Sequence, residues 1–146
     1  MLLIKSFTTI LFITAILSNI ANGADRTKML NLVNAERRKV NLPDLRLDSQ
    51  LNNAAQKHTD YMARTNILSH YENSQDPGVR IKAQGYNWST YGENIAQGQL
   101  TEDEVMKAWM SDPPHRDNIL GKMFKHLGVG YSSQGNFWTQ DFAAPL

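Results

Sequence analysis

The spacing of apolar residues in the first half of the chain predicts two helices joined by a short connector. Over residues 27–40, Leu30 and Val33 recur on one face, and Asn41-Leu42-Pro43-Asp44 ends the pattern. Asp48 is a suitable N-cap for a second helix. The inward positions of this second helix follow helical spacing and are Leu51, Ala54, Ala55, His58 and Met62. Each helix is therefore expected to bury one face against a common core.

Two shorter helical patterns follow. Residues 77–84 predict a third helix, with Val79 and Ala83 facing inward. The segment Thr101-Glu102-Asp103-Glu104 is a capping-box pattern, in which the first and last residues satisfy each other's backbone amides. It opens a fourth helix, which Pro113-Pro114 ends because proline cannot continue the hydrogen-bond ladder.

The end of the chain contains two strand candidates. Gly128–Ser132 and Phe137–Phe142 are short runs joined by the turn-like Ser133-Gln134-Gly135-Asn136, which predicts a hairpin. Helices followed by a late hairpin predict an α+β domain, in which helices cover a sheet. No internal repeat or interdomain linker is visible in the sequence.

The first residues predict export. Lys5 gives a basic start, Thr8–Ile20 is mostly apolar, and Ala21-Asn22-Gly23 offers the small residues that a signal peptidase reads. We therefore predict a signal peptide over residues 1–23 and a secreted, extracellular single domain over residues 24–146. The alternative is an uncleaved membrane anchor, although the apolar run is of marginal length for a span. Nothing later in the sequence resembles a membrane span.

Charge and cysteine content narrow the functional class. The chain has 15 Lys and Arg residues against 14 Asp and Glu residues, so loss of Lys5 with the signal peptide leaves a formally neutral domain. A neutral domain without a basic stripe is not expected to bind nucleic acid or an anionic membrane. The chain has no cysteine, so any metal site has to use nitrogen and oxygen ligands.

Four polar residues in the second half of the chain are candidates for one site: His70, Glu93, Asp112 and His115. Each lies beside apolar residues that are expected to anchor it to the core. Imidazoles and carboxylates held together bind a divalent cation such as zinc, or exchange protons near neutral pH. The two prolines between Asp112 and His115 fix the backbone of that pair.

Each of the four also has a structural explanation. His70 can be a hydrogen-bonded residue just beyond the second helix, and Glu93 can accept backbone amides. Asp112 can end one helix while His115 caps the next turn, which runs through Asn118 to Leu120. Residue patterns alone leave both interpretations open.

Three other polar positions are interpreted more simply. His58 and His126 are isolated in the sequence, and we interpret both as structural or surface residues. Asn87-Trp88-Ser89 is a glycosylation sequon with Asn87 as acceptor, which is meaningful only if the host glycosylates secreted proteins.

A series of motifs spans most of the chain in a fixed order. They are Asn34 with Arg37, Leu42-Pro43-Asp44-Leu45, Ala54-Ala55-Gln56, His70, Tyr91-Gly92-Glu93-Asn94, the Trp109 helix, Gly128-Val129-Gly130-Tyr131 and Phe137-Trp138-Thr139-Gln140. In this order, from about Leu30 to Phe142, the chain resembles the cysteine-rich secretory, antigen 5 and pathogenesis-related (CAP, or SCP) domains. The lack of cysteine makes it most similar to the bacterial-like branch of that superfamily.

The resemblance implies a three-layer α-β-α sandwich with a central cleft. The family's cleft tetrad of two histidines and two acidic residues falls here on His70, Glu93, Asp112 and His115. Many eukaryotic relatives have glutamate in place of Asp112 and the bacterial-like branch often has serine, so the shorter aspartate is expected to reach the cleft only through water. The loop implicated in sterol binding is missing, because only Pro113-Pro114 separates Asp112 from His115. A groove between helices could still hold a fatty acyl chain.

The preferred functional hypothesis is a secreted, non-catalytic binding domain. It carries a weak site for zinc or another divalent cation on His70, Glu93 and His115, and a place for a small apolar ligand such as a fatty acid. The alternative is an extracellular metal-assisted hydrolase of peptide or wall polymer, with Glu93 as the general base for a zinc-bound water. A third possibility is a purely structural tetrad on an adhesion or host-interaction module. The sequence does not identify the extracellular ligand or protein partner.

Overall fold

A four-stranded sheet forms the centre of the molecule. The computed structural model describes residues 23–146, so the predicted signal peptide lies outside the described residues except for Gly23. The strands are β1 (Arg46–Leu47), β2 (Trp88–Gln97), β3 (His126–Ser132) and β4 (Phe137–Pro145). Their order in the sheet is β1-β3-β4-β2. β1 runs parallel to β3, whereas β4 is antiparallel to both β3 and β2.

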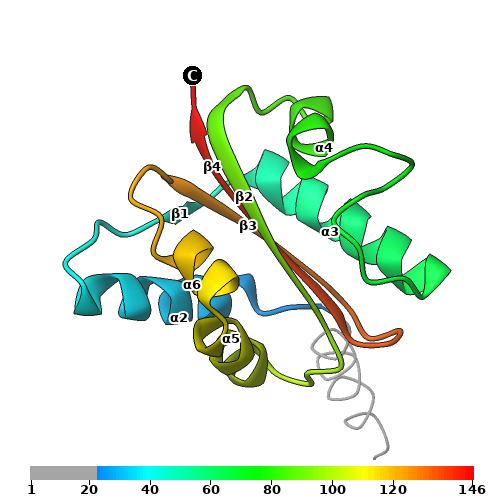
Figure 1. Ribbon diagram of the computed structural model, residues 1–146, viewed down its shortest axis with the longest axis horizontal. Helices are drawn as coiled ribbons and strands as arrows, with labels where there is room; N and C mark the ends of the chain where they lie inside the picture. Colours follow the sequence, from blue (N-terminus) through cyan, green and yellow to red (C-terminus); the bar gives the residue numbers. More distant parts are fainter. Residues whose placement is uncertain (1–22) are drawn as a thin grey trace, which may run out of the picture.

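Helices cover both faces of this sheet (Figure 1). On one face lie α3 (Ser49–Thr65) and α4 (Pro77–Ala83). On the other lie α2 (Arg26–Lys39), α5 (Glu102–Ser111) and α6 (Pro113–Ile119). The predicted α+β class and the three-layer α-β-α sandwich are therefore confirmed.

The predicted helix starts have the expected capping chemistry. The side chain of Asp48 accepts hydrogen bonds from the amides of Gln50 and Leu51 at the start of α3. Thr101 accepts from the amide of Glu104 at the start of α5, at 3.2 Å. The Glu104 carboxylate accepts from the amide of Leu100 instead of that of Thr101, so the capping box is shifted by one residue.

Three local expectations need correction. β2 was not predicted as a strand, because polar Glu93 and Asn94 occupy adjacent positions and so point to opposite faces. Residues after Pro113 form the helix α6 rather than a single turn. In α4, Val79 is 47% exposed, and the inward face is formed instead by Pro77, Gly78, Arg80 and Ile81.

The main apolar core lies between the sheet and α2, α5 and α6. Trp109 and Trp138 are each 1% exposed, as expected for large contributors to burial. The other buried members of this core are Met29, Val33, Leu45, Ala96, Val105, Met106, Ile119, Leu127, Val129 and Phe142.

On the opposite face, α3 lies unusually close to β3. A Cβ atom at Gly128 would overlap the backbone of Leu51, and one at Gly130 would lie 2.5 Å from the carbonyl oxygen of Ala55. The two glycines therefore set the distance between α3 and the sheet, which also brings inward side chains of α3 against β4.

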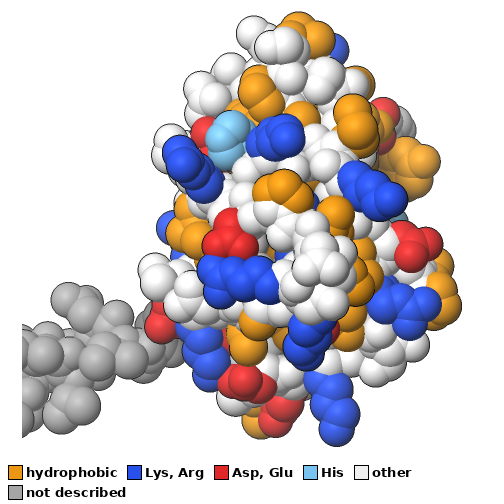
Figure 2. Space-filling view, turned by 90° about the vertical axis from the view of Figure 1, so that its left-hand side faces the viewer, with side chains coloured by type: hydrophobic (Ala, Val, Ile, Leu, Met, Phe, Trp, Pro, Cys, Tyr) orange, Lys and Arg blue, Asp and Glu red, His pale blue; other side chains and the backbone are white. Residues whose placement is uncertain are grey.

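Positive and negative side chains are mixed on the surface. Figure 2 shows Lys and Arg side chains interspersed with Asp and Glu side chains on the side of the molecule that lies to the left in Figure 1. In the part of the chain that the structure describes, no helix is both long and apolar enough to cross a membrane.

Candidate functional site

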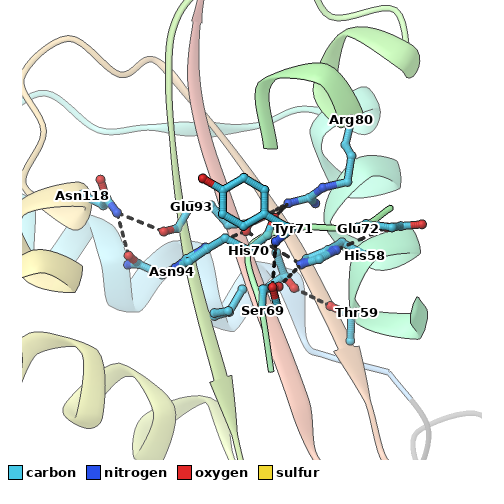
Figure 3. Close-up of polar contacts among 12 residues, drawn as sticks. His58, Thr59, Ser69, His70, Tyr71, Glu72, Arg80, Glu93, Asn94 and Asn118 are labelled. Carbon is cyan, nitrogen blue, oxygen red and sulfur yellow. Dashed lines mark hydrogen bonds and ion pairs between the residues drawn. The ribbon is translucent and has the colours of Figure 1, made fainter. Parts of the chain in front are cut away.

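His70 and Glu93 meet directly, as the proposed site requires. His70 lies in the connection between α3 and α4, and Glu93 lies in the middle of β2. Nδ1 of His70 is 2.8 Å from Oε1 of Glu93 (Figure 3). The His70 side chain is 45% exposed, whereas that of Glu93 is 1% exposed. The pair therefore joins a solvent-facing imidazole to a buried carboxylate.

Arg80 occupies the second oxygen of Glu93. Its Nη2 donates to Oε2 of Glu93 at 2.8 Å and to the carbonyl oxygen of His70, also at 2.8 Å. Arg80 is itself buried, on the inward face of α4. One guanidinium thus neutralises the buried carboxylate and holds the backbone of the histidine that the carboxylate contacts.

A second buried carboxyl lies beside the first. Asp141 is the cross-strand partner of Glu93 in the β2–β4 ladder. Burial raises the pKa of Glu93 to about 7, and burial together with the neighbouring Glu93 raises the pKa of Asp141 well above its usual range. Because Arg80 supplies one positive charge and contacts Glu93, we assign the first ionisation of the pair, with a pKa of about 7, to Glu93, and Asp141 keeps its proton to higher pH.

His58 completes the cluster from α3. It is fully buried, with Nε2 2.7 Å from the carbonyl oxygen of Ser69 and 3.9 Å from Oε1 of Glu93. Its Nδ1 lies 3.3 Å from Oε2 of Glu72. Burial and the positive charge of Arg80 lower the pKa of both His58 and His70, so both imidazoles are neutral at neutral pH.

Asp112 and His115 form a separate pair. Oδ2 of Asp112 is 2.6 Å from Nδ1 of His115, which is one turn along at the start of α6. Whether Asp112 reaches the cleft through water, as expected from its length, stays a prediction. Both side chains are partly exposed.

Two asparagines connect the pairs. The side chain of Asn94, next to Glu93, donates to the carbonyl oxygen of His115 at 3.0 Å. Asn118 of α6 donates to Oδ1 of Asn94 at 2.8 Å and to the carbonyl oxygen of Glu93 at 3.1 Å (Figure 3). The start of α6 is therefore fixed to β2 beside the Glu93 cluster.

The two histidines share one feature that bears on metal binding. Each has a carboxylate on Nδ1, and no hydrogen bond within residues 23–146 engages either Nε2. A carboxylate on one ring nitrogen orients a histidine whose other nitrogen binds a metal. Among the described residues, no group of three His, Asp or Glu side chains is placed to hold a metal ion.

The structure pairs His70 with Glu93 and Asp112 with His115, and the surroundings of these residues differ in part from expectation. The apolar neighbours of His70 do not anchor it: Ile67 is 57% exposed, and Leu68 and Tyr71 are also exposed. The expectation holds for Glu93, whose neighbours Ile95 and Ala96 are buried. Asn87 is an exposed residue just before β2, and its glycosylation stays a prediction.

Sequence reasoning missed Arg80 and Asp141, and it treated His58 as isolated. A signal was present for two of them. His58 falls in the inward set of the second helix, and Asp141 is a carboxyl within the otherwise apolar end of β4. Arg80 gave no such signal, because α4 was expected to present Val79 inward.

Comparison with known proteins places this architecture in one family. A sequence model described as the CAP, cysteine-rich secretory protein family matches residues 30–142. The chain belongs to the CAP family. This CAP chain is also 42% identical over 121 residues to YkwD of Bacillus subtilis, covering 82% of the chain and 47% of YkwD.

Solved structures agree with the assignment. An extracellular SCP-domain protein of Bacillus anthracis is 30% identical with a TM-score of 0.76, over 80% of this chain and 39% of that protein. An outer surface protein of Borrelia burgdorferi, 20% identical, shares the fold with a TM-score of 0.72, over 85% of this chain and 98% of that one. The chain thus spans less than half the length of YkwD and of the B. anthracis protein.

Proposed function

We propose that this CAP domain is an exported, non-catalytic binding domain that binds a divalent cation through His70 and His115. The observation that carries the proposal is the carboxylate on Nδ1 of each imidazole, at 2.8 Å for Glu93 and 2.6 Å for Asp112. In a neutral imidazole that donates from Nδ1, Nε2 keeps its lone pair for a ligand. Glu93 and Asp112 then act by orienting the histidines.

Zinc is the cation that this donor set fits. Neutral imidazole nitrogens suit zinc, and the absence of cysteine leaves nitrogen and oxygen donors. Two histidines give fewer protein ligands than the three or four of high-affinity zinc sites. We therefore expect weak binding, with coordination positions left for water or for a group on a binding partner.

The surroundings of Glu93 argue against the hydrolase alternative. A general base has to reach the water that it deprotonates. Both oxygens of Glu93 are already engaged, by His70 and by Arg80, and its side chain is 1% exposed. A pKa of about 7 would suit a general base, but the geometry gives this carboxylate no place for a reacting water.

Zinc titration calorimetry tests the cation site. Wild type is expected to show saturable binding at neutral pH that weakens as the imidazoles protonate. His70→Ala and His115→Ala should remove most of the binding, whereas Glu93→Gln and Asp112→Asn should weaken it on the order of tenfold. His126→Gln is the matched control, because His126 bonds Tyr86 outside the site. Absence of saturable binding in wild type contradicts the proposal.

A pocket between α2 and α5 supports binding of a fatty acyl chain. Its volume is about 340 Å³, and Leu32, Met106 and Met110 provide its apolar lining. This volume lies at the lower end of the range for small-molecule sites, and methionine adapts readily to flexible ligands. The charged lining carries both signs, with Lys107 beside Glu36 and Asp103, so the apolar residues and not the charges support the acyl chain.

Binding of a fluorescent fatty acid tests this second part of the proposal. Met110→Trp should fill the pocket and reduce affinity, whereas Leu100→Trp, at an exposed apolar position outside it, should not. Equal affinity in wild type and Met110→Trp would place the ligand elsewhere.

Export is tested by N-terminal sequencing. Support comes from the sequence of residues 1–23 and from relatives described as extracellular or as an outer surface protein. Protein recovered from culture medium should begin at Ala24. Recovery of the full-length chain from membranes alone contradicts this prediction.

A further inference from the structure

The connection that carries His70 is not held by apolar burial. No side chain from residue 66 to residue 76 is buried, and Ile67, Leu68 and Tyr71 point their apolar surface at solvent. Burial of apolar area is the usual force that fixes a segment on a domain. Other contacts therefore have to define the position of His70.

The backbone of this connection also adopts conformations that need support. Asn66, Asn73 and Ser74 have φ angles of 53°, 49° and 66°, in the left-handed region that favours glycine. Asparagine tolerates this region better than most residues, but serine has no such preference. Asn66 caps α3, and two backbone hydrogen bonds between Glu72 and Gln75 close the turn at Asn73 and Ser74, so these local bonds hold both ends of the connection but not His70 itself.

Two buried donors reach the connection from the helices below it. His58 donates from Nε2 to the carbonyl oxygen of Ser69 at 2.7 Å, and Arg80 donates to that of His70 at 2.8 Å. Figure 3 shows both side chains approaching the segment that carries Ser69, His70 and Glu72. These bonds fix two successive carbonyl groups, one of them belonging to His70 itself.

We propose that His58 is a positioning residue for His70: by holding the carbonyl of Ser69, it keeps the imidazole of His70 on Glu93. The proposal rests on the proposed cation site and adds a residue that acts through another. His58 is the informative member of the two donors, because Arg80 also contacts the Glu93 carboxylate directly.

The space next to His58 gives the connection somewhere to move. A cavity of about 120 Å³ lies between α3 and α4, lined in part by His58, Glu72 and Arg80. The protein therefore does not enforce the observed position by close packing on this side. Loss of the His58 bond should let the connection shift.

The metal-free wild type provides the first test. A proton on a fully buried Nε2 that donates at 2.7 Å exchanges slowly with water, and its NMR signal should show a contact to Ser69 or His70. Nδ1 of His70 should carry the other observed imidazole proton. A solvent-exchanging His58 Nε2 proton, or a proton on Nε2 of His70, overturns the proposal.

Two substitutions then separate positioning from packing. His58→Phe keeps the ring and removes the donor, so the amide of Glu72, which bonds Gln75, should exchange about tenfold faster. The imidazole signals of His70 should move toward those of a free histidine. His58→Gln places an amide donor near the position of Nε2 and should restore both values, and His126→Gln should leave them unchanged.

The tests of His58 can fail or succeed independently of the test of zinc binding. If His58→Phe leaves the Glu72 exchange rate and the His70 signals at wild-type values, or speeds exchange equally across the whole sheet, His58 has no positioning role. If wild type binds no zinc, the proposed function fails, while the metal-free NMR result still decides on His58. If zinc binds, His58→Phe should weaken it on the order of tenfold and His58→Gln should recover it.

Discussion

The two faces of β4 are built by opposite means. Toward α2 and α5, Trp138 and Phe142 join one continuous apolar core, and the amide of Gln140 contacts buried methionine sulfurs. Toward α3, apolar Phe137 and Ala143 flank a polar middle, in which Thr139 bonds Thr59 and Asp141 lies opposite Glu93. Successive residues of one strand thus serve a hydrophobic core on one side and a polar cluster on the other.

We infer that one face of β4 contributes mainly to stability and the other mainly to binding chemistry. Apolar burial is not directional, so the α2–α5 face needs close packing but no particular pairing of donors, acceptors or charges. Buried charges are costly unless each finds a partner, so the α3–α4 face has to place Glu93, Arg80 and His70 accurately. We therefore expect substitutions on the first face to change stability, and those on the second to change pH dependence and ligand binding.

The largest effect should come from the apolar face. Trp109→Ala removes a side chain that is 1% exposed and bonds the carbonyl of Ile95, and should lower the free energy of unfolding by about 3–5 kcal/mol. Leu100→Ala, at an exposed apolar position, is the control and should change it little. Urea denaturation measures both. Unchanged stability in Trp109→Ala would show that the α5 helix contributes nothing to the core.

A smaller loss is expected where α3 meets the sheet. Gly128→Ala forces a methyl group into the backbone of Leu51, which neither element can avoid without moving apart. We expect a destabilisation of about 1–3 kcal/mol, typical of overpacking. Because movement of α3 also moves His58, the same variant should weaken zinc binding. A stable variant with wild-type zinc affinity would show that the close approach is not required.

The carboxyl pair should make stability depend on pH. Burial raises the pKa of Glu93 from 4.5 to about 7, so below 4.5 both folded and unfolded states carry the proton. As pH rises from there to about 7, the unfolded state ionises first and stability is lost. The raised pKa of Asp141 acts with the same sign. The lowered pKa values of His58 and His70 have the opposite effect on stability. Their contribution is present at higher pH and is lost as pH falls toward their folded-state pKa values.

Asp141→Asn isolates one carboxyl of the pair. Glu93 and both histidines remain, so the comparison reports the ionisation of Asp141 together with its effect on the pKa of Glu93 and of His70. As pH rises from about 5 to about 8, the free energy of unfolding should fall more for wild type than for the variant. The difference should be on the order of 1 kcal/mol or more. Unfolding curves at several pH values measure the difference. Parallel pH profiles would show that Asp141 is already ionised in the folded state in this range, so that its pKa is not raised.

The smallest expected effect is none. The chain contains no cysteine, so neither face is linked to the other by a disulfide. The melting temperature should be the same with and without reductant. The reductant should be one that does not bind metal. A shift in melting temperature when it is added would contradict this prediction.

Much of the fold could be predicted from local patterns. Asp48 and Thr101 mark helix starts because a side-chain oxygen next to free amides is a local device. The β3–β4 hairpin follows from short strand-like runs around a turn. β2 escaped prediction because its two central polar residues face different layers, and each is satisfied by partners distant in sequence.

The sequence by itself determined the family, the order of the main helices and the late hairpin, because these depend on local spacing and on ordered motifs. The role of the four candidate site residues stays a prediction. Only the tertiary structure decided that Arg80 and His58 join His70 and that Asp141 lies opposite Glu93, whereas Asp112 and His115 pair locally, three residues apart. The reason is physical: a buried charge is stabilised by whichever partner the fold brings within hydrogen-bond distance, and those partners come from α3, α4, β2 and β4. No local pattern encodes which of these segments will meet.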